Sequence, residues 1–331
     1  MGFAFNKNRH SFVRRFAVAA TISSLLGVLS PTIAYSETPT RIIVPYGAGG
    51  GIDQIGRMFG EVLRSTENKN AIVENRPGAG GMIGMRQVAI SPPDGKTLGI
   101  AGASPLILSK LTKKDLPFNP DDLDMIASLG AFGFIIAVRS DSPYSTFSEL
   151  LDASKKEGSN LNIGSAQIGT TTQMTLDYLK SEIGLSGLSV PYTGDAEILV
   201  GLLGGNVDMG IITLTGALPM LESGKIKALG ITSENRSTRY PQIPTLNELG
   251  FPGVVSEGWV GIVVPKDTPY ETKRQYNDLV NKALVLPEFN NRLKQFGIDF
   301  VPKDLETMEA FQKSERTKWS QVAKSAGVTP N

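Results

Sequence analysis

Cysteine is absent from the 331-residue chain, and its single histidine, His10, lies close to the N-terminus. If the N-terminal segment is a leader that is removed, the remaining chain has neither residue. This excludes a Ser-His-Asp triad, a cysteine nucleophile, a histidine general base and a zinc site built on imidazole or thiolate. Disulfides are excluded as well, and a chain of this length does not need them to bury a stable core.

The sequence also lacks an apolar run of the roughly 20 residues that a membrane-spanning helix requires. Its one candidate, Phe16 to Leu29, has about 14 residues. The run follows four basic residues and precedes small residues at Ala34 and Ser36, which is the pattern of a secretory signal peptide. We therefore expect residues 1–36 to be a Sec-type leader, against the alternative of a retained anchor, and the mature chain to be periplasmic and not membrane-embedded.

A strong charge of either sign is missing too. The whole chain has 33 basic and 32 acidic residues, and the leader holds four of the basic ones and none of the acidic ones. The mature chain then has 29 against 32, a net charge of about −3. Nucleic acid and anionic lipid are not the expected partners of such a surface.

Short apolar runs alternate with segments of helical spacing along most of the chain. This alternation argues for βαβ units on mainly parallel sheets. From Pro269 onward the pattern is mostly helical, and it predicts helices at 272–286, 288–296 and 305–326. The expected strands are 41–45, 71–74, 97–101, 134–138, 161–164, 188–190, 207–212, 226–231 and 259–264.

Two successive βα series followed by returning strands predict two α/β lobes joined by crossover strands. We place the crossings near Ala137 to Ser140 and near Gly230 to Ser233. Lobe I then comprises 37–137 plus 233–331, and lobe II comprises 138–232. The cleft between such lobes is where the strand ends and helix N-termini face a ligand.

The early strands end in loops rich in glycine or serine, and each loop leads into a helix. These loops are 46–53, 76–84, 102–105, 164–172, 192–195 and 213–216. Glycine lets the backbone approach a ligand closely, and the free N–H groups and positive dipole end of the following helix bind anions without a cationic side chain. The sequence thus predicts anion-binding loops in both lobes.

Other functions are conceivable for the same residues. A Rossmann fingerprint would need a third glycine where Ile52 stands, and no P-loop lysine follows the glycines. Asp53 suits either a helix cap or a ligand contact. The spacing predicts core positions for Trp259 and Trp319, and solvated faces for the lysine pairs 113–114 and 155–156.

Seven stretches, in this order, resemble the tripartite tricarboxylate transporter substrate-binding proteins, also called the Bug family: VPYGAGGGID, VENRPGAGGMIG, PPDGKTLGI, VPYTGDAEILVGLLGGNVDM, GKIKALGIT, PTLNELGFPG and GWVGIVVPKDTP. The resemblance implies a type II periplasmic-binding-protein-like fold of two α/β lobes with a ligand cleft between them. It implies a monomeric receptor, not an enzyme and without cofactor or metal, that hands a small organic carboxylate to a permease of one large and one small integral subunit.

The family's ligand loops fall on defined positions of this chain. The residues expected to contact the ligand are Tyr46, Gly47, Ala48, Gly49, Gly50, Gly51, Asp53, Ser104, Ser165, Ala166, Gln167, Gly169, Thr170, Thr171, Tyr192, Thr193 and Thr213. No catalytic residue is expected. A sensor for a two-component kinase, or an exported hydrolase or lyase using Asp, Lys or Tyr, is the alternative function.

Three positions depart from the family pattern. Gly51 stands where a serine or similar residue is common, Gln173 replaces a frequent histidine, and Ile212-Thr213 stands where an aspartate is common. Together these changes predict a less ionisable cleft, which favours an aromatic or otherwise less polar acid over citrate. They also predict that the missing side chain at Gly51 enlarges the pocket.

Overall fold

The computed structural model describes residues 1–2, 38–49 and 51–330, so the predicted leader lies outside the described residues except for Met1 and Gly2. The described helices and strands belong to one unit, Thr38–Asn331. In chain order they are β1 (Thr40–Val44), α2 (Gly51–Glu67), β2 (Ala71–Asn75), η1 (Ala79–Gly81), α3 (Met82–Ala89), β3 (Thr97–Ala101), η2 (Ser104–Leu108), α4 (Ser109–Thr112), η3 (Pro120–Asp122), β4 (Leu123–Arg139), α5 (Phe147–Lys155), β5 (Asn162–Ala166), α6 (Thr171–Ile183), β6 (Leu188–Tyr192), α7 (Asp195–Leu203), β7 (Met209–Thr213), α8 (Leu214–Glu222), β8 (Ile226–Ile231), β9 (Glu257–Pro265), α9 (Tyr270–Leu284), α10 (Pro287–Gln295) and α11 (Leu305–Ser325).

The strands form a 9-stranded sheet in the order β2-β1-β3-β9-β4-β7-β5-β6, with β8 also paired to β4. The outer pairs are parallel, as the alternation of strands and helices predicts. The pairs that involve β4 or β9 are antiparallel: β9 runs opposite to its neighbours β3 and β4, and β4 runs opposite to β7 and β8. The predicted α/β class is confirmed as a mixed α/β fold.

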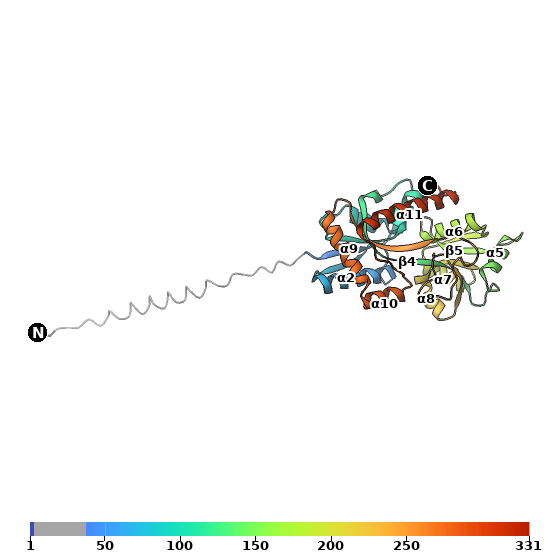
Figure 1. Cartoon of the computed structure of the whole chain (residues 1–331), viewed down its shortest axis with the longest axis horizontal. Helices are drawn as coiled ribbons and strands as arrows, with labels where there is room; N and C mark the ends of the chain where they lie inside the picture. The colour runs from blue at the N-terminus through green and yellow to red at the C-terminus, as the bar shows by residue number, and fades with distance from the viewer. Residues whose placement is uncertain (3–37, 50, 331) are drawn as a thin grey trace. The chain divides into compact units, whose positions relative to one another are not determined.

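Strand β4 connects the two halves of this sheet. Its first part, Leu123 to Gly133, pairs with β9, and its second part, from Phe134 onward, pairs with β7 and β8. We call β2, β1, β3, β9 and the first part of β4 the first half, and the rest the second half (Figure 1). The partner change at Gly133 lies just before the crossing expected at 137–140, and the lobe boundaries themselves stay a prediction.

Helices cover both faces of each half. In the first half, α2, α9 and α10 pack on one face and α3, η2 and α11 on the other. In the second half, α5 and α6 cover one face and α7 and α8 the other. The core positions predicted for the two tryptophans are confirmed, since Trp259 is 3 % exposed and Trp319 is fully buried.

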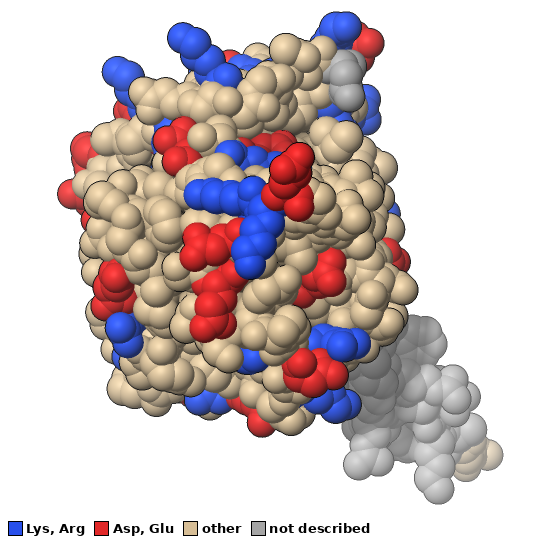
Figure 2. Space-filling model, turned by 90° about the vertical axis from the view of Figure 1, so that its right-hand side faces the viewer, with Lys and Arg blue, Asp and Glu red and all other residues tan. Residues whose placement is uncertain are grey.

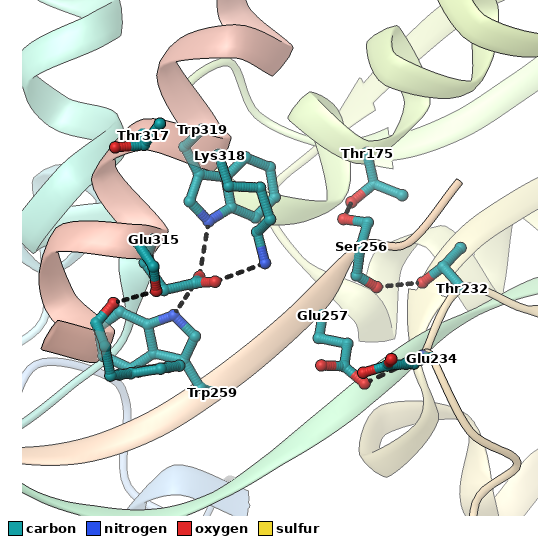
Figure 3. Close-up of polar contacts among 12 residues, drawn as sticks. Thr175, Thr232, Glu234, Ser256, Glu257, Trp259, Glu315, Thr317, Lys318 and Trp319 are labelled. Carbon is teal, nitrogen blue, oxygen red and sulfur yellow. Dashed lines mark hydrogen bonds and ion pairs between the residues drawn. The ribbon is translucent and has the colours of Figure 1, made fainter. Parts of the chain in front are cut away.

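A buried carboxylate fixes the C-terminal helix α11 to the sheet. Glu315, 6 % exposed, accepts hydrogen bonds at the same Oε2 atom from the indole N–H of Trp259 (2.8 Å) and that of Trp319 (3.1 Å). Lys318 Nζ pairs with the other oxygen at 2.6 Å. Figure 3 shows the carboxylate lying between the two indoles. A buried charge is tolerable when it is paired and hydrogen-bonded in this way.

A chain of hydroxyls lies beside this cluster, where α6 meets the segment that enters β9. The hydroxyls of Thr175 on α6 and Ser256 are 2.7 Å apart and buried, and the Thr232 hydroxyl donates to the Ser256 carbonyl at 2.5 Å (Figure 3). Met174 of α6 packs in the same core as Trp319 of α11. Helix α11, on the first half, therefore also supports a helix of the second half.

An ion pair at the outer edge of the first half gives the chain a predictable response to acid. Glu74 on β2 accepts from Arg41 on β1 at 2.6 Å and from Arg76 at 2.9 Å. The hydrogen bond from Arg41 is the main cause that lowers the pKa of Glu74 to about 2. Because the folded-state pKa lies below the unfolded value, the pair stabilises the fold above about pH 4.5, and the stabilisation is lost as the pH falls toward about 2.

We expect Glu74→Gln to lower the free energy of unfolding by about 1 kcal/mol at pH 7, a value kept small because the partners are partly exposed. The difference from the parent should shrink steadily in urea titrations at pH 4 and pH 2.5. Glu67→Gln serves as the control, since Glu67 is an exposed acid whose lysine partner lies 3.7 Å away. A difference for Glu74→Gln that persists undiminished at pH 2.5 would contradict the assignment.

The end of the molecule formed by the second half carries both charges mixed together, without a continuous patch of one sign (Figure 2). Several of these charges are paired, as in Arg139–Asp141 and Arg239–Glu222. Among the described residues, no helix combines the length and the apolar character needed to cross a bilayer.

Candidate functional site

Asp53 fixes the first glycine-rich loop, which lies between β1 and α2, by accepting a hydrogen bond from its backbone. This residue lies in the first turn of α2, is 2 % exposed, and accepts from the Gly49 N–H (2.8 Å), Arg57 Nε (3.0 Å) and Asn75 Nδ2 (2.9 Å). Burial raises the pKa of Asp53, but these hydrogen bonds outweigh it and the pKa is lowered. Both carboxylate oxygens are engaged, so the geometry favours the capping function over a ligand contact.

Asn75 was not singled out from the sequence, although it completes the same network. Its amide also donates to the Tyr46 carbonyl at 3.1 Å, which fixes the start of the loop. Asn75 is the last residue of β2 and is paired with Val44, the last residue of β1. If β1 and β2 had been predicted to pair, Asn75 would have been placed beside the loop that follows β1. Gly50, also predicted to contact the ligand, lies outside the described residues.

Gly51 begins α2 and faces the N-terminus of α8 in the second half. A Cβ atom placed on Gly51 would lie 2.9 Å from Cγ2 of Thr215, closer than side chains approach. The expectation that this glycine enlarges the pocket is therefore wrong, because Thr215 occupies the space. Gly51 instead allows the first loop and helix α8 to touch. Thr215 is held there by its hydroxyl, which donates to the Phe296 carbonyl at 2.7 Å.

A second contact between the halves encloses a small cavity. It has a volume of about 80 Å³ and brings together Ser104, Gln167, Gly169 and Thr170 of the predicted site. The other residues around it are Ala79, Gly80, Met82, Ser109, Thr112, Lys113 and Ile168. Gly169 has φ +87° and lies against Thr112, whose Oγ1 would be 3.0 Å from a Cβ at this glycine. The space suffices for a few water molecules or one carboxylate group.

Lys113, predicted as part of a solvated face, is half-buried and lines this cavity, whereas its neighbour Lys114 is exposed. Lys113 follows α4, where the helix ends and the backbone turns extended. Its place beside the loop 167–170 of the second half could not be seen from its own sequence neighbourhood. Lys155 and Lys156, in contrast, are exposed as predicted.

The hydroxyl groups of the β5–α6 loop serve mainly to start helix α6. The Thr170 hydroxyl caps the helix by accepting from Gln173 N–H at 3.3 Å and itself donates to the Gln167 carbonyl at 2.7 Å. Ser165 is 1 % exposed and its hydroxyl points to the Ala166 carbonyl. Ala166 is also buried, and its N–H donates to Thr172. The surface that this loop offers to a ligand comes from Gln167, Gly169, Thr170 and the half-buried Thr171.

Tyr192 and Thr193, at the end of β6, do not line the small cavity. The Tyr192 hydroxyl packs so tightly over Gly201 that any side chain there would collide with it, and the ring edge lies near Gly164 of β5. Gly201 is nearly two turns into α7, so this phenol fixes helix α7 to the sheet. Thr193 is exposed, and its N–H donates to Glu197 at 3.1 Å.

Thr213 caps helix α8, and its hydroxyl is fully used. It accepts from the Gly216 N–H at 2.9 Å and donates to Asp195 Oδ2 at 2.5 Å. The carboxylate of Asp195 lies against Gly216, where any side chain would collide with it. The missing aspartate after β7 was one of three departures, with Gly51 and Gln173, from which a less ionisable cleft was predicted. Asp195, the first residue of α7, brings a carboxylate to that same place.

Tyr46 and Asp195 are two ionisable residues of the loops whose pKa is raised by burial. Burial raises the pKa of Tyr46 to about 12. Burial also raises the pKa of Asp195, although the hydroxyl and N–H of Thr213 act against it. Both residues are nevertheless only half-buried. Both side chains thus lie partly at the surface, in surroundings that disfavour their ionised forms.

The described residues contain no cluster of three or more His, Cys, Asp or Glu side chains placed to hold a metal ion. The polar side chains around the cavity are four hydroxyls, the Gln167 amide and Lys113, and the Asp195 carboxylate lies apart from them at the N-terminus of α8. Such groups suit the binding of a small polar molecule.

Known proteins resemble the chain over nearly its full length. A relative from Cupriavidus necator, a UPF0065 protein in the gbd 5' region, is 32 % identical over 296 residues, which cover 88 % of this chain and 89 % of the relative. The protein BugT of Bordetella pertussis is 26 % identical and covers 96 % of this chain and 99 % of its own.

Solved structures share the fold. The R. palustris protein Rpa4515 with adipate matches with a TM-score of 0.82 and 25 % identity over 90 % of this chain and 100 % of its own. The periplasmic binding protein BugD matches with 0.78 and 30 % identity over 90 % and 100 %. MatC from Rhodopseudomonas palustris with bound malate matches with 0.76 and 26 % identity over 87 % and 100 %.

The family model described as tripartite tricarboxylate transporter family receptor matches residues 55–328. The resemblance predicted from the seven sequence stretches is thereby confirmed, and so is the prediction of a binding protein and not an enzyme. The chain belongs to the tripartite tricarboxylate transporter receptor family, whose members are periplasmic solute-binding proteins.

Proposed function

We propose that this protein captures a small organic carboxylate between two lobes and delivers it to a tripartite tricarboxylate-type permease of one large and one small integral subunit. The lobes are those predicted from the sequence, 37–137 plus 233–331 and 138–232. The protein acts as an exported monomer after removal of residues 1–36. Adipate and malate in two structural relatives support this ligand class.

The observation that carries the proposal is the cavity shared by the two halves. Ser104 and Lys113 from the first half and Gly169 and Thr170 from the second half surround a space large enough for one carboxylate. The Lys113 ammonium supplies a positive charge, and hydroxyls and backbone N–H groups supply hydrogen bonds, which are about twice as strong toward an ionised acceptor. A ligand bound there contacts both halves, so binding and closure are coupled.

The alternative of a sensor for a two-component kinase uses the same binding event and differs only in the protein that reads the closed form. An exported hydrolase or lyase would need a general base with an oriented partner. Among the described residues, the Asp195 carboxylate accepts hydrogen bonds from the hydroxyl and N–H of Thr213, and these groups do not form such a pair.

Calorimetry with a panel of mono-, di- and tricarboxylates, aromatic acids and amino acids tests the proposal. We expect at least one acid to bind with micromolar or better affinity, about −8 kcal/mol. Lys113→Met should weaken that acid by about tenfold to a hundredfold through loss of a charge-assisted hydrogen bond. Lys114→Met is the matched control, because Lys114 is exposed and does not line the cavity. Failure of every acid to bind would overturn the proposal.

A further inference from the structure

The residues where the two halves meet carry opposite charges at two separate places. Lys113 lines the cavity beside the contact between Thr112 and Gly169. Asp195 lies against Gly216, next to Thr215, whose methyl group touches the first loop at Gly51. The first place lies between η2–α4 and the N-terminus of α6, and the second between the N-termini of α2 and α8.

The Asp195 carboxylate changes what the second place can bind. The N-terminus of a helix normally favours an anion. At α8, the carboxylate of Asp195 already takes the Thr213 hydroxyl and lies over the first turn, so the helix end is occupied by an anion that belongs to the protein. In the described part of the chain, the groups that favour its ionised form are the hydroxyl and N–H of Thr213, with no lysine or arginine among them.

Resting on the proposed function, we infer that Asp195 determines specificity, selecting a monocarboxylate whose other end bears a hydrogen-bond donor, an ammonium or a hydroxyl group. The carboxylate of the ligand lies at the Lys113 cavity and its donor faces Asp195. This residue ends the stretch YTGD, where no local pattern distinguishes it from its neighbours as a ligand contact.

The expected selectivity follows from comparing two ligands of the same length, a dicarboxylate and an acid whose other end bears an ammonium or hydroxyl group. A dicarboxylate brings a second negative charge close to the Asp195 carboxylate, whose own charge is balanced by the hydroxyl and N–H of Thr213 and by no cation among the described residues, and the two like charges repel. An ammonium or hydroxyl group instead donates to an acceptor that has lone pairs to spare. We expect the donor ligand to bind at least tenfold more tightly.

Length-matched pairs of linear acids test this inference. The probes are succinate against 4-aminobutanoate, glutarate against 5-aminopentanoate, and adipate against 6-aminohexanoate, with the ω-hydroxy acids as a third series. Dissociation constants are measured by calorimetry at pH 7.5 for the parent and for Asp195→Asn. Asp195→Glu serves as the variant that keeps the charge.

For the parent, we expect the amino or hydroxy acid to bind at least tenfold more tightly than the dicarboxylate of the same length. In Asp195→Asn the amino acid should lose at least tenfold in affinity while the dicarboxylate gains, and Asp195→Glu should keep the parent's order. A parent that binds the dicarboxylate as tightly as its partner overturns the inference, and this result does not depend on the folding of any variant. An unchanged ratio in a folded Asp195→Asn overturns it as well. If no acid of these series binds to the parent although another acid of the calorimetric panel does, the inference is overturned and the proposed function stands; if no acid of the whole panel binds, the proposed function itself fails.

Discussion

Gly51→Ala is expected to weaken ligand binding by about tenfold, and Gly51→Val by about a hundredfold or more. The added Cβ would lie 2.9 Å from Cγ2 of Thr215, so α2 and α8 cannot approach as closely as they do in this structure. Thr215 cannot move away easily, because it is β-branched and its hydroxyl is bonded to the Phe296 carbonyl. We expect the two halves to separate when no ligand is bound, so that the penalty falls on the form in which α2 and α8 touch.

A compensating change makes this prediction specific. Thr215→Ser removes the methyl group that collides and keeps the hydroxyl that donates to Phe296. Gly51→Ala combined with Thr215→Ser should therefore bind within about threefold of the parent, as expected for two residues in direct contact. The thermal stability of ligand-free Gly51→Ala should be equal or slightly higher, since alanine favours helix by up to about 1 kcal/mol over glycine. Parent-like binding by the single variant, or no recovery in the double variant, would refute the contact.

Trp319→Ala is expected to lower the free energy of unfolding by about 3–5 kcal/mol, the usual cost of removing a fully buried large aromatic side chain. Trp319 is 0 % exposed and packs in the core that α11 shares with β9 and with Met174 of α6. Its loss also removes one of the two indole donors from the buried Glu315 carboxylate. Urea unfolding followed by circular dichroism measures the change.

Trp319→Phe separates the volume of the ring from its hydrogen bond. This variant keeps most of the packing, leaves the Trp259 donor and Lys318 on the carboxylate, and should cost about 1–2 kcal/mol. A loss below about 1 kcal/mol for Trp319→Ala would mean that α11 is not part of the cooperative core.

Much of the fold could be predicted because its signals are local. Each of the nine expected strands coincides with an observed one to within a few residues, except that 134–138 is only the end of the much longer β4. The first part of β4 was missed because Gly130 and Gly133 interrupt its apolar pattern, and glycine is unfavourable in an ordinary strand. Both glycines lie where other chain segments come too close for a side chain.

The site was predictable only in part, because its chemistry depends on which loops meet. Ser104, Gln167, Gly169 and Thr170 could be found from the end of a strand followed by a helix, and the structure brings them to one cavity. Asp195 and Lys113 could not, since a carboxylate in a helix's first turn and a lysine after a short helix look the same whether they face water or another loop. The collision of Gly51 with Thr215 joins residues far apart in the chain, and no local pattern reports it.

The route of the chain through β4 has a consequence for the order in which the protein can fold during synthesis. In the first half, β3 and β4 both pair with β9, which is Glu257–Pro265. The strands and helices of the second half lie between β4 and β9 in the sequence. The first half therefore cannot complete its sheet until the second half has left the ribosome. Such long-range pairing is slow to form. During synthesis the first half thus lacks its strand β9 until most of the chain has been made, whereas the strands of the second half follow one another without interruption and can pair earlier.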